Sequence, residues 1–272
     1  MSGVQQHYGR PDLLARIEAF LRERGVDPMR ISHRDLHPLD QLHGRGTEAT
    51  AEHADLAGIA PGLHVLDLGC GIGGSARHLA AERGCTVTAV DLTPEYIEVA
   101  RELTRRCGLA DRIEYRQADA LRLPFDEESF EHVWCHNVTM NIADKRGLAA
   151  EVARVLKRGG HFSCVEQTQG PAGELIFPVP WASTPSASFL VTPAAMREAL
   201  EAGGLRVLRE VDLTGKALEF MQEARARAAR GEPPLQVNQV VMGDDMAERQ
   251  RNNGRNIAEK RSADHFILAG KT

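Results

Sequence analysis

The sequence predicts an α/β fold: a doubly wound, mostly parallel sheet of seven strands with an N-terminal helical cap and lid insertions. Three observations support this prediction. Seven short apolar runs of strand length recur from residue 64 to residue 270. Helical patterns near residues 75–83, 94–106 and 144–157 separate the early runs, as in parallel strands joined by right-handed crossovers. A glycine-rich turn follows the first run directly. The runs are HVLDL, TVTAV, RIEYRQ, FEHVWC, HFSCV, LRVLREV and HFILAG.

The N-terminal region is predicted to form a cap. Residues 11–24 (PDLLARIEAFLRER) have helical periodicity, with Pro11 at the start and Gly25 after the end. Residues 27–46 contain three histidines and two prolines without a clean period, which indicates an ordered loop or cap. The segment TEATAEHADLAGI that follows has a helical pattern. One face of the first helix collects Leu13, Leu14, Ile17, Phe20 and Leu21.

The later part of the chain carries two long insertions, at about residues 167–193 and 214–261. The first is rich in proline and serine, and the second holds two helical segments around GEPPLQ. Insertions in open α/β sheets usually lie near the ligand, where they form lids. We therefore expect a cap at residues 1–46 and a main domain at residues 47–272.

Composition excludes several classes of protein. A hydrophobic content of 42%, with 26% charged residues and a net charge of −5, is ordinary for a globular protein and gives no basic footprint for nucleic acid. No apolar run reaches membrane-spanning length and no secretory signal is visible, so we expect a cytoplasmic protein. The five cysteines are scattered along the chain, and we expect them to be reduced thiols. A homodimer is compatible with the sequence, which does not fix the oligomeric state.

The glycine turn in HVLDLGCGIGG indicates close approach of backbone N–H groups to a ligand. Gly69, Gly71 and Gly74 match the G-x-G-x-x-G spacing of dinucleotide sites. Asp67 disfavours a pyrophosphate, because its carboxylate would repel that charge. A ligand with an amine and a sulfonium suits Asp67 better. A nicotinamide-dependent oxidoreductase stays the alternative of another class.

Acidic residues recur at the ends of three successive predicted strands. Asp67 lies at the first, Asp91 in TAVDLTPE at the second, and Asp119 with Ala120 after the third. A carboxylate at a strand end can accept both hydroxyls of a ribose. Together these residues outline a nucleoside pocket.

The motifs VLDLGCGIGG, VTAVDLTPEYIEVAR, ADALRLPFDEESFEHVW and EVARVLKRGG resemble, in order and spacing, those of class I S-adenosylmethionine-dependent methyltransferases. The resemblance covers roughly residues 45 to 212 and favours the branch with ubiquinone/menaquinone, sterol and sarcosine/dimethylglycine methyltransferases. It implies a Rossmann-like methyltransferase fold, S-adenosylmethionine as cofactor and a small-molecule acceptor methylated by in-line displacement. One departure is LKRGG, where Arg158 replaces the usual proline.

The resemblance implies roles for individual residues. Asp67 anchors the amino end of the cofactor and Asp91 holds the ribose. The methionine part lies along the glycine turn, Leu92 packs on the adenine, and Asp119 with Ala120 reads its edge. CHNVTMNI lies where the family contacts both cofactor and acceptor, and His43 with Gly44 resembles an element of the family's cap. The candidate cofactor contacts are Gln41, His43, Asp67, Gly69, Cys70, Gly71, Gly73, Asp91, Leu92, Asp119, Ala120 and His136.

The acceptor side carries the candidate catalytic groups His136 and Glu166. His136 is placed as a general base if the acceptor must lose a proton, and Glu166, predicted to end the fifth strand, as a base or as an anchor for an amine. A methylated amine nitrogen is therefore favoured, and the alternative is C- or O-methylation of a quinone, phenol or terpenoid. The predicted substrate contacts are Asn137, Met140, Phe177, Trp181 and Phe189, of which the three aromatics would form a wall.

Other chemistries fit the sequence less well than methyl transfer. The spacing of His33, His37 and His43, without a cysteine or a clear carboxylate partner, argues against a metal site, and none is predicted. Cys135 is expected to fill space rather than act as a nucleophile. The run HNVTMNIADK also resembles arsenite methyltransferases, but the five isolated cysteines do not form the cluster that a metalloid would need. A non-catalytic S-adenosylmethionine-binding module stays open as a third class.

Overall fold

The computed structural model describes Tyr8 and residues 12–271, and it confirms the α/β prediction. One sheet of seven strands has the order β3-β2-β1-β4-β5-β7-β6. Only β7 runs antiparallel to its neighbours β5 and β6. The strands are β1 (His64–Leu68), β2 (Thr86–Asp91), β3 (Ile113–Gln117), β4 (Phe130–His136), β5 (Leu156–Gln169), β6 (Leu205–Asp212) and β7 (Ser262–Lys271).

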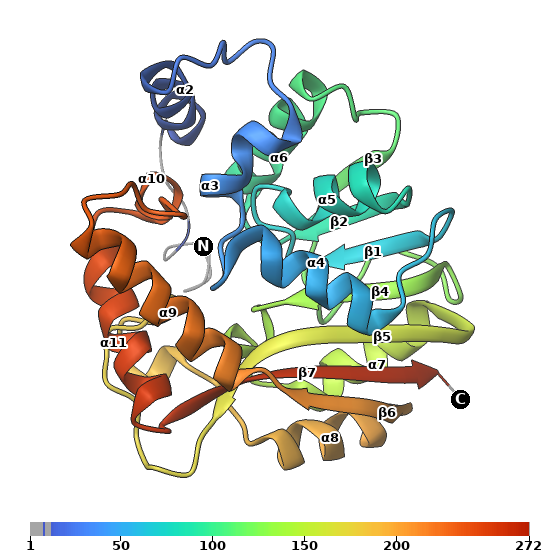
Figure 1. Cartoon of the computed structure of the whole chain (residues 1–272). Helices are drawn as coiled ribbons and strands as arrows, with labels where there is room; N and C mark the ends of the chain where they lie inside the picture. Colours follow the sequence, from blue (N-terminus) through green and yellow to red (C-terminus); the bar gives the residue numbers. More distant parts are fainter. Residues whose placement is uncertain (1–7, 9–11, 272) are drawn as a thin grey trace.

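Helices cover the sheet and gather at one of its ends. Figure 1 shows α3, α9, α10 and α11 at the end to which β1 points, whereas α8 lies along β6. Three short 3-10 helices span His33–Leu36, Thr139–Asn141 and Pro185–Ala187. The α-helices are α2 (Leu13–Glu23), α3 (His37–Asp40), α4 (Gly46–Ala57), α5 (Gly74–Glu82), α6 (Pro94–Arg106), α7 (Lys145–Val155), α8 (Pro193–Ala202), α9 (Thr214–Ala229), α10 (Gln239–Met242) and α11 (Met246–Ala258).

All seven predicted strands form, and the fifth differs most from its prediction. The run HFSCV predicted residues 161–165, but β5 spans Leu156–Gln169. Its first residue, Leu156, pairs with Phe130 of β4. Its last residue, Gln169, pairs with Ser262 of β7. Glu166 therefore lies inside a strand and not at its end, which corrects the prediction.

The cap and the second insertion pack together. Leu13, Ile17 and Leu21 of α2 are buried in one apolar cluster with Val241 and Met242 of α10. The predicted helix is confirmed from Leu13, while Pro11 lies outside the described residues. The second insertion holds three helices, α9, α10 and α11, rather than two. The division at residue 46 stays a prediction.

The cap is also held to α5 by a buried ion pair. Arg77 donates to the Asp40 carboxylate at 2.9 Å, and both side chains are almost fully buried. A Cβ on Gly74 would lie 2.1 Å from the Asp40 carbonyl oxygen, so α3 and the start of α5 touch backbone to backbone. The cap is therefore fixed directly above the glycine turn.

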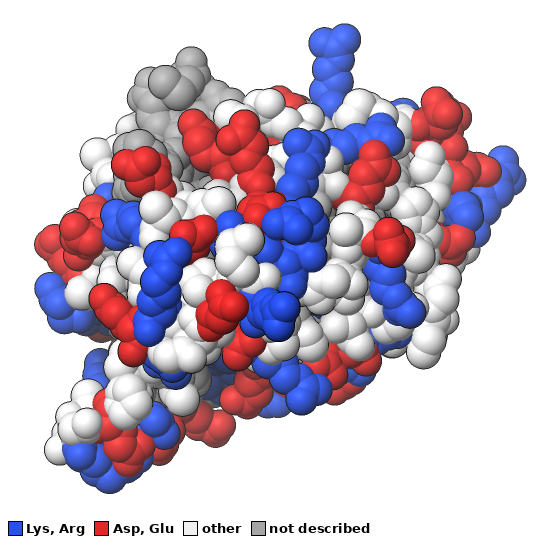
Figure 2. Space-filling view, turned by 90° about the horizontal axis from the view of Figure 1, so that it is seen from above, with Lys and Arg blue, Asp and Glu red and all other residues white. Residues whose placement is uncertain are grey.

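The face of the molecule seen from above carries charged side chains of both signs (Figure 2). On the face seen in Figure 2, basic and acidic side chains are interspersed. Within residues 12–271 and Tyr8, no helix is both long enough and apolar enough to cross a membrane.

Candidate active site

A cavity of about 440 Å³ opens at the carboxyl ends of β1, β2, β3 and β4. Parallel strands that end at one edge bring their terminal residues together there, and ligands of open α/β sheets bind at this edge. Twelve residues predicted from the sequence line it: His43, Asp67, Gly69, Cys70, Gly71, Asp91, Leu92, Asp119, Ala120, His136, Asn137 and Phe189.

The glycine turn is shaped by close contacts. Gly69 has a φ of +75°, and a Cβ there would lie 2.4 Å from a Val138 methyl carbon. Gly71 also has a positive φ, of +54°. The amides of Gly69 and Cys70 both donate to the Val90 carbonyl, so the turn is fixed against β2. Only glycine combines this backbone with this closeness.

Asp67 presents a buried carboxylate to the cavity. The residue is 2% exposed, and its Oδ2 atom has no hydrogen-bond partner among the described residues. Burial, together with the negative charge of Asp91, raises the pKa of Asp67 to about 7. A buried, unsatisfied carboxylate oxygen favours a cationic or hydrogen-bond-donating ligand group. The amino group of an S-adenosyl cofactor fits this requirement.

Asp91 ends β2 and joins two elements of the site. Its Oδ2 accepts from the Gly71 amide and its Oδ1 accepts from the Thr93 amide, both at 2.9 Å. Burial raises the pKa of this carboxyl, and the two amides lower it. Each carboxylate oxygen can accept more than one hydrogen bond. Asp91 therefore holds the glycine turn and keeps acceptor capacity for a ligand.

Two histidines that line the cavity stack on each other. The rings of His43 and His136 lie 3.6 Å apart at 8°. The Thr50 hydroxyl lies 3.1 Å from His43 Nε2, and His136 Nδ1 is buried without a partner in the described part of the chain. Burial lowers the pKa of His43 to about 4 and that of His136 well below its usual value. Both rings are therefore neutral at pH 7.

Glu166 does not line the cavity, contrary to its predicted role as a base or amine anchor. The residue is 1% exposed, and its carboxylate accepts from the amides of Val138 and Thr139, the latter at 3.0 Å, and from the Cys135 thiol. Burial raises its pKa. The carboxylate therefore serves the turn after β4.

The structure places only one member of the predicted aromatic wall at the cavity. Phe189 lines the cavity, but Phe177, Trp181 and Met140 do not. They pack with Val179 and neighbouring residues into a small cluster of the lid itself. Hydrophobic burial is the commoner use of large aromatics. The Trp181 indole N–H, which needs a partner when buried, donates to the Ser188 hydroxyl at 2.9 Å.

Two predicted cofactor contacts also have structural partners instead. Gly73 does not line the cavity, and a Cβ there would lie 2.3 Å from the Tyr115 hydroxyl. Gln41 is 1% exposed, and its side chain accepts from the Thr50 hydroxyl at 2.6 Å. The same Thr50 hydroxyl lies 3.1 Å from His43 Nε2, so Gln41 is linked to His43 through Thr50. Over the described ranges, no group of three side chains is arranged to hold a metal ion.

Several cavity residues were not predicted. They come from distant segments, and the same apolar cluster unites four of them. Helical periodicity marks such residues as buried but does not say which cavity they face. The four are Tyr8, Leu42, Tyr96 and Met242.

Comparisons with known proteins agree with this geometry. Residues 66–164 match the family model described as a methyltransferase domain. Methyltransferase GfsG of Streptomyces halstedii is 35% identical over 131 residues, which cover 48% of this chain and 46% of that protein. A sterol 24-C-methyltransferase of Gibberella zeae is 36% identical over 109 residues, 40% of this chain and 29% of that protein. The chain thus spans less than half the length of these relatives.

A solved structure supports the fold over nearly the whole chain. The [4+2]-cyclase SpnF superposes with a TM-score of 0.69 at 22% identity, covering 98% of this chain and 95% of that one. At this identity the likeness concerns the fold alone. Residues 66–164 therefore resemble a methyltransferase domain, and both relatives named above are methyltransferases.

Proposed function

We propose that the cavity binds S-adenosylmethionine and that the protein transfers its methyl group to a small acceptor. The single observation that carries this proposal is the pair Asp67 and Asp91 at adjacent strand ends beside the glycine turn. When bound, the cofactor supplies a sulfonium methyl group for in-line displacement. Asp67 would hold its amino group and Asp91 its ribose, as the family resemblance implies.

The acceptor proposed here is predominantly apolar. Leu42, Tyr96, Met242, Ile142 and Phe189 line the cavity beyond the strand ends. The carboxylate and two of the three aromatics that favoured an amine, Glu166, Phe177 and Trp181, lie outside the lining. The sterol relative methylates a carbon acceptor by its name, which agrees with an apolar cavity. Carbon or oxygen on a terpenoid, phenol or quinone skeleton is therefore now preferred over nitrogen.

His136 is proposed to orient the acceptor as a neutral imidazole. Its protonated form is disfavoured by burial, by His43 and His53, and by Arg45. A base with so low a pKa accepts a proton poorly at neutral pH. Alignment of the acceptor with the methyl carbon can provide much of the rate without a base.

The test is calorimetry of S-adenosylmethionine, S-adenosylhomocysteine and a nicotinamide dinucleotide with the wild type, Asp91→Ala and the matched control Asp111→Ala. Asp111 is exposed and lies outside the cavity. Binding of the two S-adenosyl compounds, lost only in Asp91→Ala, supports the proposal. Binding of the dinucleotide alone overturns it.

A radiolabelled methyl group then identifies the reaction. Transfer from S-adenosylmethionine is measured with sterol, terpenoid, phenol and quinol acceptors and, separately, with amines. Label in the apolar products supports the proposed acceptor class. Label in the amines alone would favour the amine nitrogen that the sequence predicts as the methylated atom. Binding without transfer to any acceptor points to a non-catalytic module or to another reaction in the same fold.

A further inference from the structure

The turn after β4 is held by two buried side chains of opposite charge. Its residues Asn137, Val138, Asn141 and Ile142 line the cavity. The turn begins at Asn137 with a φ of +55°, a conformation that non-glycine residues adopt only where the surroundings impose it.

Glu166 binds the N–H side of this turn. Its carboxylate accepts from the Val138 amide at 3.1 Å and 3.2 Å, and from the Thr139 amide at 3.0 Å. The same side chain accepts from the Cys135 thiol just before the turn. An ionised carboxylate that accepts several N–H groups is a strong anchor.

Lys145 binds the carbonyl side. Its ammonium group donates to the Thr139 carbonyl at 2.8 Å and to the Ile142 carbonyl. It also donates to the Phe189 carbonyl of the lid, at 2.7 Å. An ammonium group has three N–H donors, so this arrangement uses all of them.

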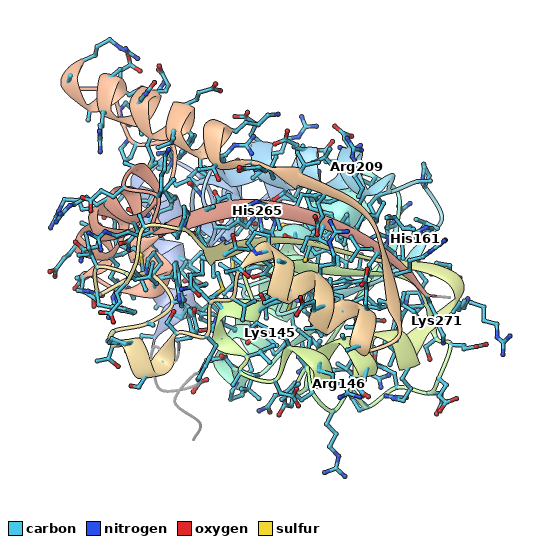
Figure 3. The ribbon with its side chains drawn as sticks, turned by 90° about the horizontal axis from the view of Figure 1, so that it is seen from below. Lys145, Arg146, His161, Arg209, His265 and Lys271 are labelled. Atoms are coloured by element: carbon cyan, nitrogen blue, oxygen red, sulfur yellow. The ribbon has the colours of Figure 1, made fainter. Side chains whose placement is uncertain are left out.

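The position of Lys145 would be unfavourable for a cation without these three hydrogen bonds. It is the first residue of α7, where the helix dipole disfavours a cation. The residue is only 6% exposed, and burying a charge is costly unless it is paired and hydrogen-bonded. The next residue, Arg146, is exposed; Figure 3 labels both at the start of α7.

The lid depends on the same turn. The Phe189 amide donates to the Met140 carbonyl at 2.9 Å, so both backbone groups of Phe189 are tied to the turn region. Met140 packs in one cluster with Trp181 and Leu190 of the lid. Turn and lid are thus connected by hydrogen bonds and by an apolar contact.

We propose that Lys145 and Glu166 are paired positioning residues that together hold the acceptor-facing turn, and that Lys145 latches Phe189 of the lid to it. The role toward an acceptor rests on the proposed function, but the latch itself is measurable without methyl transfer. Neither residue lines the cavity. They act through the backbone of the turn, which lines the cavity.

The charge of Lys145 makes the latch sensitive to pH. Burial lowers the pKa of Lys145 to about 8, while Glu166 from β5 and Cys135 from β4 act in the opposite direction. Above this pH the neutral amine has two N–H donors for three carbonyls. The contact with the lid then weakens, and Trp181 becomes more accessible.

The first measurement is acrylamide quenching of tryptophan emission from about pH 7 to about pH 9.5, with and without S-adenosylhomocysteine. Trp134 is fully buried in the core, so increased quenching reports Trp181. We expect quenching to rise with a midpoint near pH 8. A flat wild-type profile, together with wild-type quenching in Lys145→Met at neutral pH, would overturn the latch.

Three variants sharpen the measurement. Lys145→Met should show high quenching at neutral pH and no transition, whereas the matched control Arg146→Met should behave as the wild type. Glu166→Gln keeps an acceptor oxygen for the two amides but removes the counter-charge, so the midpoint should fall by about one pH unit. An unchanged midpoint in Glu166→Gln, or a wild-type transition in Lys145→Met, contradicts the pairing.

Two further controls separate the possible failures. If Lys145→Met does not fold, the wild-type and Glu166→Gln profiles decide the question. S-adenosylhomocysteine affinity should stay within about twofold in Arg146→Met, since Arg146 neither lines the cavity nor holds the turn. Failure of the wild type to bind S-adenosylhomocysteine would refute the proposed function. The quenching measurements without ligand would still test the latch.

Discussion

The two sides of the cavity are built in different ways. The proposed cofactor side uses Asp67, Asp91 and Asp119 at the ends of three parallel strands, together with the glycine turn between β1 and α5. The proposed acceptor side brings together Tyr8, Leu42, Tyr96, Met242 and Phe189 from five distant segments. Local strand-turn-helix patterns determine the first side, and tertiary packing determines the second.

The largest expected effect concerns the glycine turn. Gly69→Ala would place a Cβ 2.4 Å from a Val138 methyl carbon, at a residue whose φ is +75°. The left-handed backbone and the overpacking together should lower the free energy of unfolding by about 3 kcal/mol. Urea unfolding measures it.

The matched control is Gly44→Ala, whose Cβ would meet nothing within 4 Å. It should change the free energy of unfolding by less than about 0.5 kcal/mol. Equal effects of the two substitutions would show that the turn is not tightly packed against the acceptor-facing residues.

Asp91→Ala should weaken S-adenosylhomocysteine binding by about 100-fold. The substitution removes the acceptor for the Gly71 and Thr93 amides and for the proposed ribose hydroxyls, and charged hydrogen bonds contribute about 1.5–3 kcal/mol each. Calorimetry measures the change. An affinity within about threefold of the wild type would place the ribose elsewhere.

The protonation of Asp67 should make cofactor affinity depend on pH. Its pKa of about 7 means that the carboxyl is half protonated near neutrality, and a cationic amino group binds the ionised form. S-adenosylhomocysteine should therefore bind about tenfold more weakly near pH 6 than near pH 8. Asp67→Asn should lose this dependence. A pH profile that persists in Asp67→Asn assigns it to another group.

The smallest expected effect is that of His136→Gln. A general base contributes about 10²–10⁴-fold to a rate. Because the protonated form of His136 is disfavoured by burial and by His43, we expect kcat to fall by less than about tenfold with an accepted substrate. Single-turnover rates measure it, and a loss of 10³-fold would restore His136 as a base.

The sequence predicted the fold and many of the residues that line the cavity at the strand ends, because both follow from contiguous patterns. Asp91 could be placed at a strand end from the run TAVD alone, and the cavity lining agrees with that placement. The resemblance then supplied a proposed role for each residue. Gly73 was predicted as a cofactor contact but does not line the cavity. It packs closely against the Tyr115 side chain of β3, and this contact between distant residues is not visible in the sequence.

The acceptor side could not be predicted for a physical reason. Glu166 and Trp181 were recognised as unusual residues, but a sequence does not show whether a carboxylate faces a ligand or two backbone amides. Trp181 packs within the lid, where burial of its ring and a bond to Ser188 satisfy it. Lys145 gave no signal at all, because its three partners are carbonyl groups from two separate segments.

The central claim is that Asp67 and Asp91 hold an S-adenosyl cofactor beside an apolar acceptor space. The most direct measurement is the crystal structure of the complex with S-adenosylhomocysteine. The account predicts the ribose hydroxyls on Asp91, the amino group on Asp67, and the sulfur facing the space between His136 and Phe189. A ligand bound elsewhere, or in this cavity with its ribose away from Asp91, would contradict it.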